Sequence, residues 1–540
     1  MFKRYFYTII HLKPHQIYYR IFFTFLKPRP SLKAYSSLSK PNKEWRFCGN
    51  PRQIIDREQI TFLNESYSMN AIDWNSQKAS KLWMYNLHYF DFLYANHQEE
   101  ARNESLIDHW IDHNPPANGI AWDSYPTSLR IVNWIKWCLA GNINSTKILD
   151  SLYLQSDWLS KRVEHHIEGN HLFANGKALL FAGLFFSSFQ SAKFKKMGLK
   201  ILQNELTKQV LEDGGHFELS PMYHAIITED ILDLIQLSKI FPDSFPQELE
   251  QSMRSVVTQM ISWLDAMTHS DGTMPFLNDA TNNISHTLLA IQEYAVFLEI
   301  PYTANNDELI MLPESGYYIY QTNEYKMIMD LADIGPNYQP GHAHADTFSF
   351  EVSIHKNKFI VNLGISSYQG EETRVKERGT SNHSTLLIDG KNSSDVWGEF
   401  RVGQRAKIIS KNISRESNDL ILQASHDGYK RIYGSPIHRR EFVLSKKSIA
   451  INDSISGSGN HEVTILFHLH PEVIILGHDD SSIDLMHEEL NITFNSSLMS
   501  SLQIIESMYA PEFGMQVPTK SIALKEKLSF PSTINSSFTW

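Results

Sequence analysis

The hydrophobic pattern of the chain changes near residues 301–315, and this change divides it into two parts of different structural class. From roughly residue 80 to 300, apolar residues follow helical spacing, and within 131–138 they stand at positions i, i+3, i+4 and i+7. Afterwards, short β-rich runs such as 358–363 are separated by turn signals. Many short strands with few helices indicate antiparallel sheets, most simply a sandwich. We therefore predict an α+β multidomain protein, with stacked helical pairs followed by an antiparallel β-sandwich.

Composition and charge exclude several classes of protein. The chain has 540 residues, of which 42% are hydrophobic, and this suits two or three well-packed domains. Two cysteines exclude both a disulfide framework and a cysteine zinc site. Net charge is −11, yet residues 1–43 contain nine Lys or Arg and no acidic residue, so the remainder carries −20. An acidic body argues against nucleic acid as a partner.

The basic N-terminal segment has two interpretations. Its apolar runs, Tyr5–Leu12 and Ile21–Leu26, are too short to span a membrane. A basic and aromatic segment suits contact with an anionic membrane surface, and the alternative is a pad that packs on the main domain. A positively charged N-terminus followed by a short apolar run is typical of a signal peptide, but no clear small-residue cleavage site follows.

The segment Gly341–Asp346 concentrates ionisable groups. If a strand begins at its histidines, His342, His344 and Asp346 point to one face, because strand side chains repeat every two residues. Two imidazoles and a carboxylate on one face could hold a metal, supply a proton acceptor, or both. The alternative is a polar strand edge exposed to water.

Two polar loops precede predicted helices in the first half of the chain. They span residues 168–175 and 213–224. The backbone N–H groups and the dipole at a helix N-terminus favour an anion, so a carboxylate bound there would be partly neutralised. The alternative is ordinary capping by Asn170, Asn175 and Ser220. Walker, GxGxxG, GxSxG and HExxH motifs are all missing from the sequence.

Six motifs together resemble the heparinase II/III family of polysaccharide lyases and lyase-like proteins, in particular members linked with capsule or exopolysaccharide gene clusters. The motifs stand in family order at residues 82–93, 122–137, 169–186, 213–226, 341–352 and 380–390. The resemblance implies an incomplete (α/α) toroid over residues 81–312 and an antiparallel β-sandwich over 313–540, after a basic extension over 1–80. Ligand would lie in the cleft between the two parts.

The resemblance also implies a reaction, β-elimination at a uronic acid of an acidic polysaccharide or oligosaccharide. Asn170 and His171 match the pair that neutralises the uronate carboxylate, Tyr223 the acid and His342 the base. Further residues of the motifs are expected to contact substrate: Asn86, His88, Tyr125, Arg130, Asn175, Glu218 and His224. Arg378 and Trp397, from two loops of the β half, are expected to contact it as well.

Characterised relatives hold a metal, commonly zinc, and the resemblance places its ligands here at His344, Asn362 and His383. The family has a carboxylate where this chain has Asn362, and a neutral amide oxygen is the weaker zinc ligand. Asp346 compensates only if its side chain turns inward. We expect such a zinc, or another divalent metal, to be structural.

Two further functions and the location stay open from sequence. A uronate C5-epimerase would remove the C5 proton and return a proton to C5 without cleavage. A non-catalytic protein of polysaccharide assembly would keep only the cleft. A polymeric substrate implies a bacterial periplasmic or cell-envelope location, and the missing cleavage site leaves the cytoplasm as the alternative.

Overall fold

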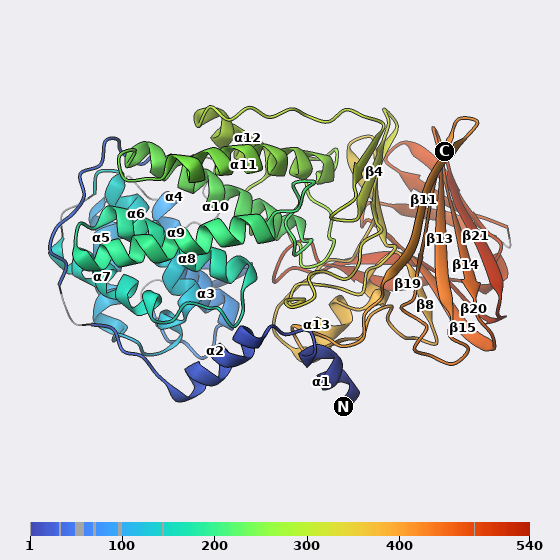
Figure 1. The fold of residues 1–540 in the computed structure, drawn as a ribbon. Coiled ribbons are helices and arrows are strands. Elements are labelled where there is room, and N and C mark those ends of the chain that lie inside the picture. The colour runs from blue at the N-terminus through green and yellow to red at the C-terminus, as the bar shows by residue number, and fades with distance from the viewer. Residues whose placement is uncertain are drawn as a thin grey trace.

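The computed structural model divides into a helical half and a β half (Figure 1). It describes residues 2–31, 34–48, 59–68, 72–95, 100–142, 145–479 and 481–540. Of the predicted extension over 1–80, residues 1, 32–33, 49–58 and 69–71 lie outside this described part. No helix of the described residues is long and apolar enough to cross a membrane.

The helical half is built from helices that pack side by side around a large aromatic and aliphatic core. Its helices are α3 (Lys81–Tyr89), α4 (Phe92–Ala95), α5 (Glu100–His113), α6 (Ser124–Leu139), α7 (Thr146–Ser160), α8 (Gly169–Phe185), α9 (Phe189–Gln209), α10 (Pro221–Ile240), α11 (Gln247–Met267) and α12 (Leu288–Phe297). Helix α8 is buried on nearly every side, as its apolar sequence predicts. It lies very close to α9, because a Cβ added to Gly183 would come within 2.3 Å of the backbone nitrogen of Lys195.

The β half contains two large antiparallel sheets. One has the order β19-β20-β15-β7-β6-β5-β4-β3, with β8 beside β15, and the other has the order β11-β12-β13-β14-β21-β18-β17-β16. The first comprises β3 (Leu309–Leu312), β4 (Tyr317–Gln321), β5 (Tyr325–Asp330), β6 (Phe350–Ile354), β7 (Asn357–Val361), β8 (Leu386–Ile388), β15 (Asn460–Leu469), β19 (Leu502–Tyr509) and β20 (Val517–Ser529). The second comprises β11 (Ile408–Glu416), β12 (Asp419–His426), β13 (Ile437–Ser445), β14 (Ser448–Ser456), β16 (Ile474–His478), β17 (Ile483–His487), β18 (Leu490–Ser496) and β21 (Ser532–Thr539).

The two large sheets share one apolar core, so they form a sandwich. Phe350 of one sheet meets Phe442 of the other with ring centroids 5.6 Å apart, and Phe467 meets Phe538 at 5.5 Å. The remaining described strands form two small hairpins. One pairs β1 (Gln59–Phe62) with β2 (Glu65–Ser68), and the other pairs β9 (Val396–Trp397) with β10 (Arg401–Val402). The predicted fold class, α+β with a helical toroid before an antiparallel sandwich, is confirmed.

The predicted strand at the histidines of 341–346 is wrong. Residues 341–349 form an irregular loop, and β6 begins only at Phe350. The loop turns at Phe348, whose φ of +69° ends any regular alternation. The side chains of His342 and His344 therefore do not share a face, and each contacts a different set of partners.

The N-terminal segment packs on both halves of the molecule. Helix α1 (Phe2–Ile9) lies on the β half, where Tyr5 meets Trp397 at a centroid distance of 4.9 Å. Helix α2 (Pro14–Phe25) lies on the helical half, where Lys13, just before the helix, pairs with Glu168 at 3.0 Å. Both helices run along the lower edge of the molecule in Figure 1.

A buried arginine connects the second sheet to the loops of the first. Arg440, on β13, donates two parallel hydrogen bonds to Asp453 at 2.8 and 2.9 Å. Its remaining nitrogen donates to the backbone carbonyls of Phe348 and Ser384 at 2.9 and 3.0 Å. One side chain thus holds the loop that carries His342 and the segment that follows His383.

Removing this arginine is expected to destabilise the β half. Arg440→Met leaves Asp453 buried without its guanidinium partner, and losing one member of a buried ion pair costs about 3–5 kcal/mol. We expect a lower midpoint of thermal unfolding. The matched control is Arg439→Met, because Arg439 is the exposed neighbour on the same strand and such surface changes alter stability by about 0.5 kcal/mol or less. Equal midpoints for the two variants would contradict this account.

Candidate active site

A cavity of about 880 Å³ lies between the helical half and the β half. The helical half contributes Asn86, Tyr125, Asn170, His171 and Tyr223 to its walls, and the β half contributes His342, Tyr368 and Phe400. All four residues predicted to be catalytic therefore line one space, although up to 172 positions separate them in sequence. Asn86 and Tyr125, predicted to contact substrate, line it as well.

His342 is oriented by two neighbours from the helical half. Its Nδ1 hydrogen is donated to Oε2 of Glu218 at 2.5 Å. Its ring stacks on that of Tyr223, with centroids 3.8 Å apart and planes at 10°. Since Glu218 accepts the Nδ1 hydrogen, Nε2 keeps its lone pair and is the basic atom of the ring.

Glu218 also connects His342 to the start of helix α8. The backbone N–H of Asn170, in the first turn of that helix, donates to Oε1 of Glu218 at 3.0 Å. Burial alone would raise the pKa of Glu218, but the adjacent His342 and this N–H outweigh burial and hold it below its ordinary value. Gly169 makes the approach possible, because its φ is +59° and a Cβ there would lie 2.4 Å from Oε1.

Asn170 and His171 stand in the first turn of α8, as the sequence predicts. The side-chain oxygen of Asn170 is buried and has no hydrogen-bond partner, which is costly unless a ligand supplies one. The ring of His171 lies against Tyr125 at a centroid distance of 4.3 Å, and its Nδ1 is 3.2 Å from Oε1 of Glu164. Burial would lower the pKa of His171, but the Glu164 carboxylate outweighs it and the pKa is raised.

Tyr223 presents its hydroxyl group to a second tyrosine. The hydroxyl oxygens of Tyr223 and Tyr368 are 3.1 Å apart. Burial raises the pKa of both phenols well above 10, so both stay protonated at neutral pH. Tyr223 is therefore a proton donor in the resting site. Sequence reasoning missed Tyr368, which is a single tyrosine in the loop after β7 and belongs to no recognised motif.

Seven residues predicted to contact substrate do not line the cavity: His88, Arg130, Asn175, Glu218, His224, Arg378 and Trp397. Most are buried and bonded internally. Arg130 donates to Gln155, and His224 contacts the carbonyl of Met260 at 2.8 Å. Trp397 instead packs on helix α1. Spacing in the sequence alone does not separate a residue of the cavity wall from one that supports the wall.

Three of these residues hold other residues of the site in place without lining the cavity themselves. Asn175 bonds both the backbone and the carboxylate of Glu164, at 2.8 and 3.0 Å, and so positions the partner of His171. Arg378 donates twice to the carbonyl of Ala343, at 3.0 and 2.8 Å, and fixes the loop between His342 and His344. Glu218 orients His342. Each acts through a residue that the motifs also contain.

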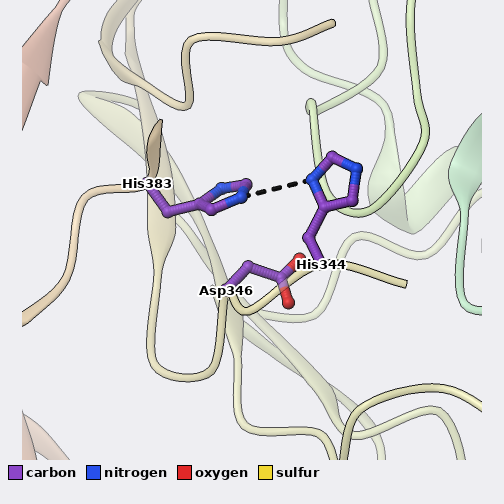
Figure 2. Close-up of side chains that lie close together, drawn as sticks. All are labelled: His344, Asp346 and His383. Atoms are coloured by element: carbon purple, nitrogen blue, oxygen red, sulfur yellow. Dashed lines mark hydrogen bonds between the residues drawn. The ribbon is translucent and has the colours of Figure 1, made fainter. Parts of the chain in front are cut away.

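A second cluster lies behind the cavity wall, where His344, Asp346 and His383 bring their ligand atoms within 4.8 Å of one another (Figure 2). Nδ1 of His344 is 3.2 Å from Nε2 of His383. Two nitrogens bound tetrahedrally to zinc at 2.0–2.1 Å are separated by about 3.3 Å, so the pair fits a metal. Burial lowers the pKa of His344 to about 4, which leaves its lone pair free.

The carboxylate of the cluster comes from Asp346 and not from the position predicted to supply the third ligand. Asp346 turns inward, and burial raises its pKa to about 6. The amide oxygen of Asn362 accepts the backbone N–H of Ser384 at 3.2 Å. His344 is further fixed by Asp279, which accepts its Nε2 hydrogen at 2.8 Å. Such a carboxylate behind a ligand histidine is common in metal sites.

The charge of His171 can be tested in the free protein. Glu164→Gln removes the carboxylate that contributes most against burial, so the pKa of His171 is expected to fall from its raised value. As pH rises, His171 would then lose its positive charge at a lower pH than in the unmodified chain. The imidazole carbon-bound proton resonances, assigned with His171→Gln, report this pKa by NMR. Glu399→Gln, another carboxylate of the cavity wall, is the control. An unchanged His171 titration in Glu164→Gln would overturn the assigned ion pair.

Comparison with known proteins identifies the family. Residues 52–305 match the model "Heparinase II/III N-terminus", and residues 304–537 match "Heparinase II/III-like, C-terminal". Heparin-sulfate lyase of Pedobacter heparinus is 28% identical over 270 residues, which are 46% of this chain and 40% of that protein. Heparin-sulfate lyase of Bacteroides thetaiotaomicron is 26% identical over 408 residues, 66% of this chain and 55% of that one.

Solved structures agree with the fold. A crystal structure of heparinase III superposes with a TM-score of 0.71 at 18% identity, covering 87% of this chain and 79% of that one. A mutant of heparan sulfate lyase HepC from Pedobacter heparinus superposes with a TM-score of 0.60 at 19% identity. The match covers 97% of this chain and 87% of that one. The chain spans about half the length of the curated relatives it matches. With both family models matched in order over residues 52–537, the chain belongs to the heparinase II/III family.

Proposed function

We propose that this chain is a polysaccharide lyase that cleaves a uronic-acid-containing polysaccharide by β-elimination. The observation that carries the proposal is the convergence of Asn170, His171, Tyr223 and His342 on one cavity, with Glu218 orienting His342. The relatives named heparin-sulfate lyases support the reaction class.

In the proposed elimination, His342 acts as the base and Tyr223 acts as the acid. Nε2 of His342 takes the proton from C5 of the uronate, and the electron pair left behind forms the double bond between C4 and C5. The bond from C4 to the glycosidic oxygen breaks, and the Tyr223 hydroxyl group gives its proton to that oxygen. An imidazole base and a neutral phenol suit these steps. The Tyr368 hydroxyl, 3.1 Å from that of Tyr223, returns a hydrogen bond to the phenolate.

Removal of the C5 proton requires neutralisation of the adjacent carboxylate. Asn170 and His171 stand at the N-terminus of α8, where the helix dipole favours an anion. The Glu164 carboxylate raises the pKa of His171 and so favours its positively charged form. Charge stabilisation in a water-poor site is usually the largest contribution to such a reaction. Both residues therefore act on the enolate-like transition state.

The charges of the cavity wall favour a substrate with few sulfate groups. Among the described residues, the wall contains five basic side chains, Arg20, Lys81, Lys136, Arg162 and Lys177, and seven acidic ones, Asp91, Asp123, Glu164, Glu229, Asp230, Asp233 and Glu399. Lys136 and Lys177 are already paired with Asp233, and Lys177 also pairs with Asp230 at 2.5 Å. Dense sulfation would meet net negative charge, so a polymer with uronate as its main anion fits better.

The proposal predicts an unsaturated product. Purified protein is mixed with unsulfated and sulfated uronate polysaccharides, and the conjugated double bond is followed by ultraviolet absorbance. We expect activity on unsulfated polymers and little on heavily sulfated ones. Tyr223→Phe and His342→Ala are each expected to lower kcat/KM by about 100- to 10,000-fold, the contribution of a positioned acid or base.

Tyr85→Phe is the matched control, because Tyr85 lines the same cavity and donates its hydroxyl hydrogen to Asp123. Wild-type activity in Tyr223→Phe would refute the assigned acid. Solvent deuterium incorporated at C5 without chain cleavage would indicate a C5-epimerase, and binding without either reaction would indicate a glycan-binding protein.

We also propose that His344, His383 and Asp346 hold one structural divalent metal, for which zinc fits the donor set. The metal would tie the loop of His342 to the segment that carries His383, and it would supply no step of the reaction. Because Asp346 supplies the carboxylate, the neutral Asn362 does not prevent binding.

Metal content separates the two candidates for the third ligand. Elemental analysis of purified protein is expected to give about one zinc per chain, and chelation is expected to lower the unfolding midpoint. Asp346→Asn and His383→Ala are expected to lose the metal, whereas Asn362→Ala keeps it. Metal lost from Asn362→Ala but kept by Asp346→Asn would mean that Asn362 is the ligand.

A further inference from the structure

Apolar side chains are exposed in unusual number on the N-terminal helices. Of twenty large hydrophobic side chains exposed among the described residues, nine fall within residues 5–26. They are Tyr5, Phe6, Ile9, Ile10, Ile17, Tyr18, Ile21, Phe25 and Leu26, and we call them the N-terminal apolar surface. Large apolar patches are rare on soluble proteins and mark sites of interaction.

Helix α2 has two different apolar faces. Tyr19 and Phe23 face inward, with ring centroids 4.8 Å from His165 and 5.6 Å from His166. Ile17, Ile21 and Phe25 follow at i, i+4 and i+8 on the outer face, and Phe25 is 81% exposed. The inner face thus fixes the helix on the molecule, and the outer face is left without a partner within the described chain.

A basic cavity adjoins this surface. It measures about 590 Å³ and lies between α2 and α9. Lys193, Lys196 and Lys200 line it from α9, at spacings that place them on one face of that helix, and all three are exposed. The two acidic residues of its wall are already paired, Glu168 with Lys13 and Glu205 with Lys208. The cavity therefore offers positive charge beside the aromatic side chains of α2.

The two N-terminal helices lie outside the region matched to the family, whereas the lysines of α9 lie within it. The family models match residues 52–537, so α1 and α2 precede the matched region. Residues 1–43 carry nine basic and no acidic side chains, while the remainder carries −20. Among the described residues of this segment, Arg20 alone lines the cavity proposed for catalysis.

We propose that the N-terminal apolar surface, together with the lysines of α9, docks on an anionic membrane surface. Amphipathic helices with aromatic and aliphatic outer faces bind at the headgroup boundary, and nearby lysines are attracted to acidic lipids. An anionic bilayer offers an apolar layer that complements the exposed apolar side chains and negative charge that complements the lysines. The other exposed apolar side chains of the described residues are distributed in sequence between residues 189 and 515.

Vesicle flotation tests the docking with the full chain. Vesicles of phosphatidylcholine alone are compared with vesicles that also contain phosphatidylglycerol, at low and high salt. We expect flotation with the anionic vesicles only, and weaker flotation at high salt. Ile17→Ser/Ile21→Ser/Phe25→Ser and Lys193→Gln/Lys196→Gln/Lys200→Gln are each expected to weaken binding by about tenfold or more.

The matched control is Met311→Ser/Ile409→Ser/Leu476→Ser, which removes three apolar side chains of the β half that are 53–54% exposed. It is expected to bind like the unmodified chain. Circular dichroism and unfolding midpoints confirm that each variant folds. Absent flotation with anionic vesicles, or equal loss in the control, would overturn the proposal. A third outcome would also overturn it. Light scattering would show a dimer that dissociates when Ile17, Ile21 and Phe25 are replaced, and the unmodified chain would not bind vesicles.

Discussion

The candidate site depends on one buried carboxylate, that of Glu218. Its two oxygens accept hydrogen bonds from different parts of the molecule, Oε1 from the backbone of Asn170 and Oε2 from the imidazole of His342. The first bond fixes the helix end where a uronate carboxylate would lie, and the second sets which nitrogen of His342 is basic. The two tasks of an elimination, charge neutralisation and proton removal, are therefore coupled through one side chain. Gly169 is required for this approach, because any Cβ there would clash with the carboxylate.

The loop that carries His342 has no regular structure and is held by side chains from several elements. Arg378 binds the carbonyl of Ala343, Arg440 binds that of Phe348, and Asp279 accepts from His344. Asp279 is in turn paired with Arg374 at 2.5 Å. Charged groups buried at this density are costly unless each is bonded, and here each bond fixes one point of the loop. A metal between His344, Asp346 and His383 would add one more point of attachment.

Much of the fold and part of the site could be predicted from the sequence. The change from helical to strand spacing near residues 301–315 falls at the passage from α12 to β3. A helix N-terminus does carry Asn170 and His171, although α8 begins at Gly169 and the predicted loop over 168–175 is therefore mostly helical. These are local properties, fixed by periodicity and capping. The path of residues 341–349 could not be predicted, because Arg378 and Arg440, distant in sequence, determine it. For the same reason the sequence leaves the direction of Asp346 open, gives no signal for Tyr368, and suggests that Glu218 contacts substrate.

The position of a bound uronate oligosaccharide in a crystal of Tyr223→Phe would test the account most directly. The account predicts that C5 of one uronate lies about 3–3.5 Å from Nε2 of His342, in a near-attack geometry, with its carboxylate against Asn170 and His171. The glycosidic oxygen on C4 should then face the position of the missing hydroxyl group. A sugar bound in this cavity with C5 turned away from His342, or bound only outside the cavity, would contradict the assigned chemistry.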